Sequence, residues 1–390
     1  MIDKFYNGYI LPFRDLHFVI FLFASFISVC GTSMMQMAYM FELGGLSALQ
    51  ALQFYLAQFG ILGFFVMPLA FILYRKINVL TWHGMIVLLT LIPALLLPVF
   101  QGNYFATGTL LSLSVSGFWI LFHIYLTENA SNTNKGNEIS LTLNAVALGS
   151  LTGIGFATLF TLLEVSAFSM GIAGCLLGFA GVLTFAYFNY RLCRMRPKEP
   201  VETATLFEVL REKPTRSFNT FFSGIMEIPT FVLFPLWLLL SGIGVLSVGL
   251  VSIFTMVLKV AISAFAGHLS NQKSDRGISI GNGIVGAGWL PWFIVPTLVS
   301  VPVATIIWSI GMHIRKVSSA GQWYERKSLH LLAAMAICIC TGRMVGFAIT
   351  IPVIYFYTQE FIILGLGVSF CVFLLSVFLT YKDKTQAQKH

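Results

Sequence analysis

The sequence predicts an all-α polytopic membrane protein with twelve transmembrane helices in two six-helix bundles. Of its 390 residues, 57% are hydrophobic and only 10% are charged, whereas about 25% of the residues of an ordinary soluble domain are charged. The mean hydropathy is +0.86. This apolar surface exceeds what one soluble core can bury, so lipid must cover part of it. The apolar runs and the placement of the basic residues then define the individual helices.

Apolar runs of about 17 to 25 residues, long enough to cross a bilayer as helices, recur along the whole chain. Pro291, Pro296 and Pro302 interrupt the ninth and tenth runs, which can be divided in more than one way. A count of eleven spans would put the two termini on opposite sides of the membrane. The expected spans are 16–40, 46–74, 78–99, 104–127, 139–163, 166–190, 217–240, 243–266, 278–296, 299–314, 328–357 and 361–380.

The basic residues support twelve spans. All but two of the 23 lysines and arginines fall in segments that twelve spans place on one side of the membrane, Arg315 and Lys316 among them. The charged residues of the opposite loops are the acids Glu42, Glu164 and Glu360. Because short cytoplasmic loops are enriched in lysine and arginine, we expect a multi-pass plasma-membrane protein with both termini in the cytoplasm. The very short outer loops favour a bacterial inner membrane.

The longest loop, residues 191–216, is polar and basic and follows the sixth span. It divides the chain into an N-terminal bundle at 1–190 and a C-terminal bundle at 217–390, each with six spans. Two such halves joined by a cytoplasmic loop are typical of secondary transporters, which bind their solute between the halves.

The segment after the eighth span, Gly267–Lys273, has the sequence GHLSNQK. Together with the two halves and the central loop, it resembles the major facilitator superfamily, whose loops after the second and eighth helices carry the signature G-x-L-x-D-R/K-x-G-R/K-R/K. The glycine, the leucine and, one position late, a basic residue match. Asn271 stands in place of the acidic residue, and the equivalent loop of the first half keeps only Arg75 and Lys76.

The resemblance implies a set of gating residues on the inner face. In the family, an acidic residue at the end of the fourth helix belongs to a charge network that holds the outward-open state. Carried onto this sequence, the network pairs Glu128 with Arg75, and Glu325 or Asp275 with the basic loops of the second half. The gating residues that the resemblance implies are Glu128, Arg75 and the signature residues Gly267, Asn271 and Lys273. Ion pairs that form in one state and break in the other bias the equilibrium between the states. The alternative is that these residues only solvate the membrane interface.

Three charged residues, Glu227, Lys259 and Arg343, lie deep in apolar runs. Each would cost at least about 2.5 kcal/mol if it faced lipid at the bilayer centre, so we expect them to face the interior with partners. At a rise of about 1.5 Å per residue, Glu227 and Lys259 lie at similar depths and Arg343 lies nearer the outer half. Whether Glu227 pairs with Lys259 or with Arg343 stays open.

Two functional roles suit these charges. Glu227 is a candidate proton acceptor, whose protonation would release a salt bridge. Lys259 or Arg343 is a candidate for holding an anionic group of the solute. The alternative is a fixed ion pair that only orients the helices.

Weaker candidates surround these charges. Asn144, in the fifth span, can bond either to the solute or to a neighbouring helix. By the resemblance, Trp119, Phe231 and Trp237 belong to helices that line the cavity, although lipid-facing packing is the alternative for each aromatic residue. His123 lies near the inner interface, where a histidine is ordinary.

An enzyme is not expected, because the spans contain no paired carboxylates, no HExxH motif and no nucleophile with a histidine partner. No catalytic residue, metal site, cofactor or nucleic-acid partner is predicted. The pattern favours a monomeric secondary transporter that moves a small organic solute, anionic or zwitterionic, together with protons by alternating access. The alternatives are an uncoupled facilitator, an exporter of an amphipathic compound, and a transporter-like scaffold or receptor that transports nothing.

Overall fold

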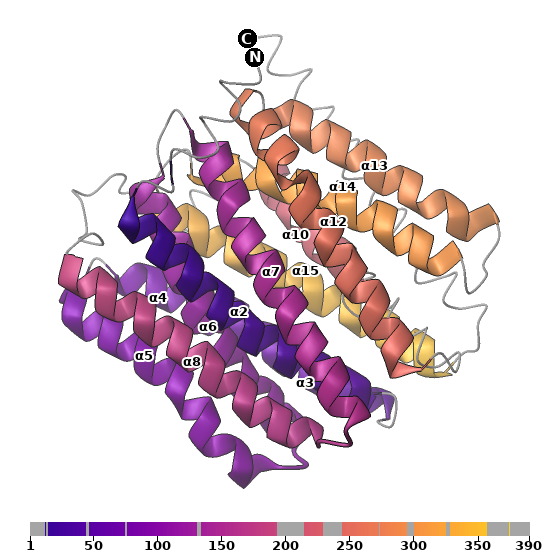
Figure 1. Ribbon diagram of the computed structural model, residues 1–390, viewed down its shortest axis with the longest axis horizontal. Coiled ribbons are helices and arrows are strands. Elements are labelled where there is room, and N and C mark those ends of the chain that lie inside the picture. Colours follow the sequence, from indigo (N-terminus) through magenta and orange to yellow (C-terminus); the bar gives the residue numbers. More distant parts are fainter. Residues whose placement is uncertain are drawn as a thin grey trace.

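The computed structural model shows a bundle of long helices, and the part of the chain that it describes contains no strand (Figure 1). The described residues are 12, 15–43, 47–74, 76–130, 134–192, 214–228, 244–272, 274–294, 300–324, 328–356 and 374.

The six spans predicted before the central loop are all present as helices. The second span is one continuous helix built from three segments, and the third ends in a short 3-10 turn. The elements are α2 (Leu16–Leu43), α3 (Ala48–Gly60), η2 (Ile61–Val66), α4 (Met67–Leu73), α5 (Val79–Leu96), η3 (Leu97–Phe100), α6 (Tyr104–Asn129), α7 (Lys135–Leu162) and α8 (Ala167–Leu192).

Five helices follow the central loop among the described residues. They lie where the seventh to eleventh spans are expected, although the second half of the seventh span, 229–240, and the twelfth span at 361–380, apart from Leu374, fall outside the described residues. The elements are α10 (Pro214–Ile228), α12 (Val245–Gln272), α13 (Ser274–Ile294), α14 (Ser300–Tyr324) and α15 (Leu329–Phe356).

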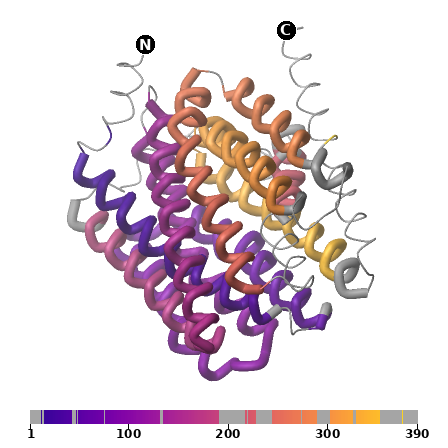
Figure 2. Tube along the Cα trace, turned by 45° about the vertical axis from the view of Figure 1, so that its right-hand side comes forward, coloured from indigo at the N-terminus to yellow at the C-terminus, as the bar shows by residue number. Residues whose placement is uncertain are grey.

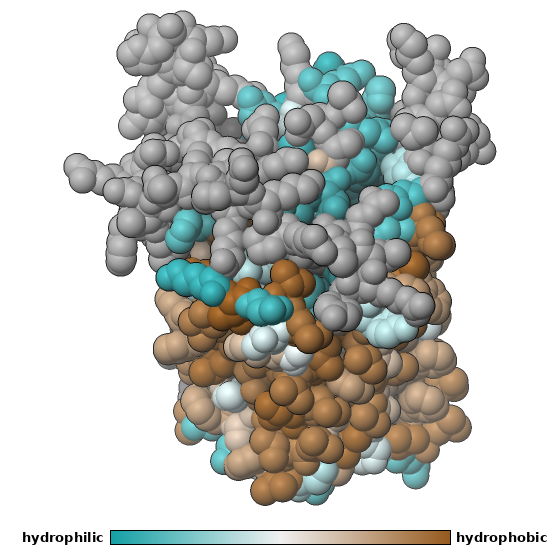
Figure 3. Space-filling model, turned by 90° about the vertical axis from the view of Figure 1, so that its left-hand side faces the viewer, coloured by the Kyte–Doolittle hydropathy of each residue, from teal (hydrophilic) through white to brown (hydrophobic). Residues whose placement is uncertain are grey.

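The surface of the bundle is that of a membrane protein. Eight of the described helices are long and apolar enough to cross a bilayer. Large hydrophobic side chains such as Phe65, Leu88 and Phe254 are exposed on them. Figure 3 shows this hydrophobic surface on one face of the molecule, with hydrophilic residues gathered above it. The protein is therefore a multi-pass membrane protein, as its composition predicts.

We call the helices before the central loop the first group and those after it the second group (Figure 2). In the first group α2 packs along both α7 and α8, and in the second α13 packs along α14 and α10 along α15. The most extensive contacts between the groups are those of α7 with α12 and of the second span with α15. We call the end where α7 begins and α12 ends the basic end, because Lys76, Lys135 and Arg276 lie there.

Glycine residues allow the closest of these helix contacts. A Cβ atom on Gly31 of α2 would lie only 2.6 Å from the backbone nitrogen of Gly178 on α8. In a membrane, small residues at such positions let helix backbones approach and gain van der Waals contact. The position therefore excludes any larger residue unless the two helices move apart.

The second span changes its helical pitch at its middle. Residues Ile61–Val66 form a π-helical segment just before Pro68, whose ring cannot donate to the helical hydrogen-bond ladder. Gly63 of this segment lies against Cys340 of α15, with the carbonyl oxygen of Ala336 3.3 Å from where a Cβ would stand. The irregular turn thus lies at a contact between the two groups.

One sequence assignment is wrong. Arg315 and Lys316, expected in the loop after the tenth span, lie inside α14, which continues to Tyr324. The rule that reads basic residues as cytoplasmic applies to loops. It misleads here because both side chains belong to a partly polar interior.

We predict that Gly31→Ala lowers the stability of the protein by about 1–3 kcal/mol, because the added methyl group overpacks the α2–α8 contact. Thermal unfolding of purified protein in detergent measures the effect. Gly155→Ala is the matched control, since a Cβ there meets nothing within 4 Å and alanine favours a helix. Unchanged melting of the Gly31 variant would contradict the close approach of α2 and α8.

Candidate functional site

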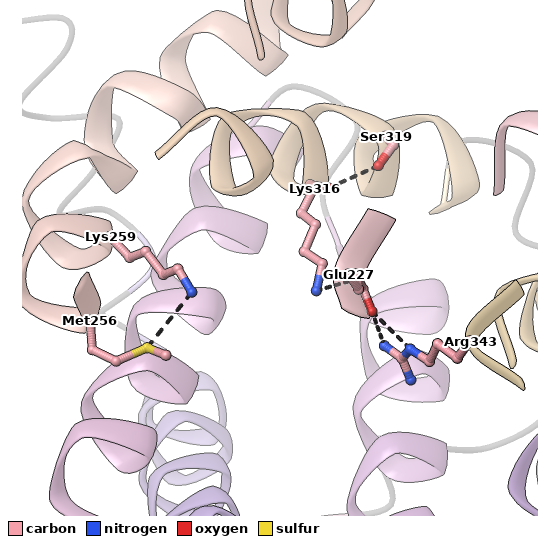
Figure 4. Close-up of polar contacts among 6 residues, drawn as sticks. All are labelled: Glu227, Met256, Lys259, Lys316, Ser319 and Arg343. Atoms are coloured by element: carbon pink, nitrogen blue, oxygen red, sulfur yellow. Dashed lines mark hydrogen bonds and ion pairs between the residues drawn. The ribbon is translucent and has the colours of Figure 1, made fainter. Parts of the chain in front are cut away.

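Four helices of the second group bring charged side chains into the interior. Glu227 lies near the end of α10, Lys259 on α12, Lys316 on α14 and Arg343 on α15. Figure 4 shows Lys259, Lys316 and Arg343 pointing from different sides toward the middle of the bundle. We call these four residues the charge cluster.

Close packing of α10 on α15 brings Glu227 to Arg343. Gly224 lies one turn before Glu227, and a Cβ on it would stand 2.9 Å from the backbone nitrogen of Arg343 and 3.0 Å from the Cα of Gly342. The two helix backbones therefore lie in contact just where the carboxylate and the guanidinium emerge. The glycines determine the geometry of the ion pair.

The Glu227 carboxylate lies between two cations. The Nε of Arg343 donates to Oε2 at 2.8 Å, and its Nη2 contacts the same oxygen. The Nζ of Lys316 lies 2.5 Å from Oε1. Each carboxylate oxygen thus has its own cation, and the partner that the sequence leaves open is Arg343 rather than Lys259.

The ion pairs border on accessible space. Glu227 is 2% exposed, whereas the side chains of Lys316 and Arg343 keep 40% and 22% of their surface accessible. The two cations are therefore more accessible than the acid that they contact. This asymmetry matters because a charge-assisted hydrogen bond to a guanidinium or an ammonium is among the stronger polar contacts.

Arg343 is also held by the other group of helices. Its guanidinium carbon lies 5.0 Å from the ring centroid of Phe59, a cation–π distance. Phe59 belongs to α3 and stacks on Phe347 of α15 with a centroid distance of 5.4 Å. The arginine therefore lies where the two groups meet.

Lys259 approaches the cluster from α12. Its Nζ lies 3.9 Å from the sulfur of Met256. It is also close enough to Lys316 and Glu227 to interact electrostatically with both. The antiparallel register of α7 on α12 pairs Ser140 with Ser263 and Thr158 with Gly249. This register brings Asn144 of α7 to the level of Lys259.

Two further polar residues of α14 belong to the same region. His313 and Arg315 are both buried. The Nε2 of His313 and the hydroxyl of Ser263 share a hydrogen bond of 2.6 Å, and Ser263 also donates to the Lys259 carbonyl at 2.8 Å.

Nothing in the sequence pattern singles out His313, and Arg315 and Lys316 are assigned there to a loop. A signal for the longer helix exists nonetheless. The segment between Val303 and Leu329 contains no proline, and two glycines are its only residues that disfavour a helix strongly. A helix that continues past its charges is compatible with that composition.

The two groups also touch at the basic end. The side-chain oxygen of Asn271, on α12, accepts a hydrogen bond of 2.6 Å from the backbone N–H of Gly136. A Cβ on Gly267 would lie 2.7 Å from the Cβ of Ser140, whose hydroxyl donates to the Ser263 carbonyl. The first turn of α7 carries unpaired N–H groups and a partial positive charge, so the Asn271 oxygen is a fitting partner.

A second bridge at the basic end joins α6 to α14. The Nδ1 of His123 and the hydroxyl of Tyr324 share a hydrogen bond of 2.6 Å. Trp119 stacks on His123 with a centroid distance of 5.9 Å. His123, expected only near the inner interface, therefore connects the two groups.

For the other predicted site residues the structure gives burial at most. Glu128 is buried in the last turn of α6. Arg75, Lys273, Phe231 and Trp237 lie outside the described residues. Their predicted roles in gating or in lining the cavity stay predictions.

Sequence comparison finds no match: no protein-family model and no curated protein matches this chain. Solved structures match its fold over nearly its whole length. The fucose:proton symporter of E. coli is 15% identical, with 96% of this chain and 99% of the symporter covered and a TM-score of 0.64. A bacterial homologue of the iron transporter ferroportin, in an outward-facing state, is 13% identical, with 95% and 100% covered and a TM-score of 0.65.

The human organic anion transporter is a third such structure, 11% identical, with 92% of this chain and 98% of that chain covered and a TM-score of 0.62. At these identities the likeness shows the fold alone. The chain has the fold of the major facilitator superfamily, which its sequence resembles, and the structures that share this fold carry the names of transporters, not of enzymes.

We predict that Arg343→Gln destabilises the protein by about 3 kcal/mol, at the lower end of the range for breaking a buried ion pair because Lys316 remains beside Glu227. Chemical or thermal unfolding of Arg343→Gln, Glu227→Gln and the double variant forms a double-mutant cycle. The double variant should lose less stability than the sum of the single variants. Arg276→Gln, at an exposed position, is the control, and additive losses would show that the two side chains are not coupled.

Proposed function

We propose that the protein is a secondary transporter that moves a small organic anion across the membrane by alternating access of its two halves. The observation that carries the proposal is the charge imbalance of the interior. Lys316 and Arg343 contact the carboxylate of Glu227, and Lys259 and Arg315 lie near enough to interact electrostatically with it. Charges within a bilayer are costly unless opposite charges match them. An anionic solute would reduce this excess of positive charge.

The distribution of acidic residues along the sequence supports the same charge imbalance. Glu227 is the sole acidic residue between Arg216 and Asp275, and no acidic residue occurs between Arg276 and Tyr324 or between Leu329 and Phe356. The helices that hold the cations therefore contain no second carboxylate. A cationic solute would add to the imbalance, whereas an anionic solute reduces it.

Competition for the same cations provides proton coupling. When Glu227 is ionised, its oxygens hold Arg343 and Lys316, and the solute must displace it. When Glu227 is protonated, its hold on the cations weakens and the solute anion can take its place. One proton and one negative charge enter together, so the empty and the loaded site carry the same net charge. The reorienting carrier then avoids moving an uncompensated charge through the bilayer.

The contacts at the basic end act as a gate in this proposal. Asn271 with Gly136, Gly267 with Ser140, and His123 with Tyr324 join the two halves there. They must separate for the site to open on that side and re-form when it closes. The predicted gating roles of Gly267 and Asn271 are supported by their positions at this contact.

The solved structures that share the fold support the proposal by analogy. One is named a fucose:proton symporter and another an organic anion transporter. Their names describe those proteins, whereas the charge cluster of this chain favours an anionic solute independently of them. The bacterial inner membrane, the cytoplasmic termini and the monomeric state stay predictions from the sequence.

Glu227→Gln tests the coupling. In liposomes the wild-type protein should accumulate a radiolabelled organic anion when the outside is more acidic than the inside. The variant should lose gradient-driven accumulation and keep exchange of labelled for unlabelled anion. Its neutral side chain can neither carry a proton nor neutralise the cations after the anion leaves. Glu164→Gln, at the opposite end of the bundle, is the control. If accumulation by both wild type and variant is independent of the pH gradient, coupling through Glu227 is wrong and an uncoupled facilitator remains.

Tyr324→Phe tests the gate. Loss of one hydrogen bond, worth about 1 kcal/mol, should shift the ratio of open to closed basic ends by about fivefold. Spin labels at Lys76 and Arg276, both exposed at that end, would report a larger population of long distances. Tyr104→Phe is the control, because its hydroxyl contacts Glu42 of the same half. An unchanged distance distribution would remove His123 and Tyr324 from the gate.

A further inference from the structure

Aromatic rings from the two halves alternate where the second span lies against α15. Tyr55 stacks on Phe347 with a centroid distance of 4.2 Å and an interplanar angle of 7°, and Phe347 stacks on Phe59 at 5.4 Å and 11°. The guanidinium carbon of Arg343 lies 5.0 Å from the centroid of the Phe59 ring and completes the series. We call these four residues, two from α3 and two from α15, the ring ladder.

The ring ladder follows from helical spacing. Tyr55 and Phe59 are four residues apart on α3, and Arg343 and Phe347 are four residues apart on α15, so each pair lies on one face of its helix. Phe347 meets both rings of α3, and Arg343 meets the second of them. The two helices are therefore antiparallel, and Arg343 is the member of the ladder nearest the basic end.

Glycine residues keep the second span close to α15 beside the ladder. A Cβ on Gly60 would stand 3.3 Å from the terminal methyl carbon of Met344, and a Cβ on Gly63 would overlap Cys340. The two helices pack this tightly directly after Phe59. The ring of Phe59 consequently reaches the guanidinium of Arg343 only while the two halves keep this contact.

Arg343 has partners in both halves. Its Nε donates to the Glu227 carboxylate of its own half at 2.8 Å, while Phe59 belongs to the other half. We infer, resting on the proposed function, that Phe59 is a positioning residue through which the ionisation of Glu227 acts on the arrangement of the two halves. An ionised Glu227 fixes the guanidinium where Phe59 contacts it and so favours the present arrangement. A neutral Glu227 releases the guanidinium, and the contact between the halves weakens.

A cation–π contact suits this role in strength and in geometry. The cation is attracted to the face of the ring, and the stack with Phe347 fixes the plane of the Phe59 ring. The side chain of Arg343 is 22% exposed, so water screens the contact only in part. Such a contact changes an equilibrium by about threefold to thirtyfold. That effect biases two arrangements of the halves without locking either of them.

Spin labels at Lys76 and Arg276, both exposed at the basic end, test the inference without any solute. Glu227→Gln imitates the protonated acid and should raise the ratio of open to closed basic ends by about threefold or more. Phe59→Leu should raise it to a similar extent, because the π face is lost. In the double variant the second substitution should add little, since both remove the same link. Phe59→Trp should keep the wild-type response, because tryptophan is the strongest cation–π partner.

Fluorinated phenylalanines in place of Phe59 separate the charge of the ring face from the volume of the ring. Each added fluorine reduces the negative charge of the face with little change of shape. The open population should therefore rise stepwise with the number of fluorines. Phe185→Leu is the control, because its ring contacts Phe21 and Tyr125 of the same half. This variant should keep the full response to Glu227→Gln.

Two results would overturn the inference and leave the proposed function standing. One is an equal response to Glu227→Gln in the wild-type and Phe59→Leu backgrounds. The other is an open population that does not depend on the number of fluorines. If Glu227→Gln leaves the distances of the wild-type protein unchanged, the ionisation of Glu227 does not act on the halves, and the proton coupling of the proposed function fails together with the inference.

Discussion

The lack of water inside a bilayer is the constraint on which this structure depends. A carboxylate at the depth of Glu227 persists only with cations beside it, and Arg343 and Lys316 provide one for each oxygen. These contacts tie α10, α14 and α15 into one unit. The close glycine contact of α10 with α15 follows from the same need, because a wider helix separation would take the carboxylate out of reach of the guanidinium.

A buried ion pair is a poor means of gaining stability. Desolvation of the two charges offsets much of their attraction, and well-packed apolar residues often do as well. Retention of a carboxylate with several cations in an otherwise apolar bundle is therefore better explained by exchange of partners than by stability. In the proposed cycle Glu227 and the solute anion take turns at the same cations, so the interaction that holds three helices together is also the one that transport breaks.

The contacts between the two halves at the basic end have a different character. They consist of single hydrogen bonds between small or aromatic residues, such as Asn271 with Gly136 and His123 with Tyr324, around a close approach at Gly267. Each such bond contributes about 1 kcal/mol. Contacts of this size suit a surface that separates and re-forms.

Hydropathy and the cost of charge in lipid act locally along the chain, so the class of the protein, most of its spans, the basic end and the three deep charges are predictable from the amino-acid order. Which of the charges meet depends on how the helices pack. The choice of Arg343 over Lys259 as the partner of Glu227 depends on which helices are neighbours, and α10 packs on α15. Lys316 belongs to the cluster because α14 continues beyond Arg315 and Lys316 as a helix. A rule based on loops cannot recognise a lysine whose counter-charge comes from another helix.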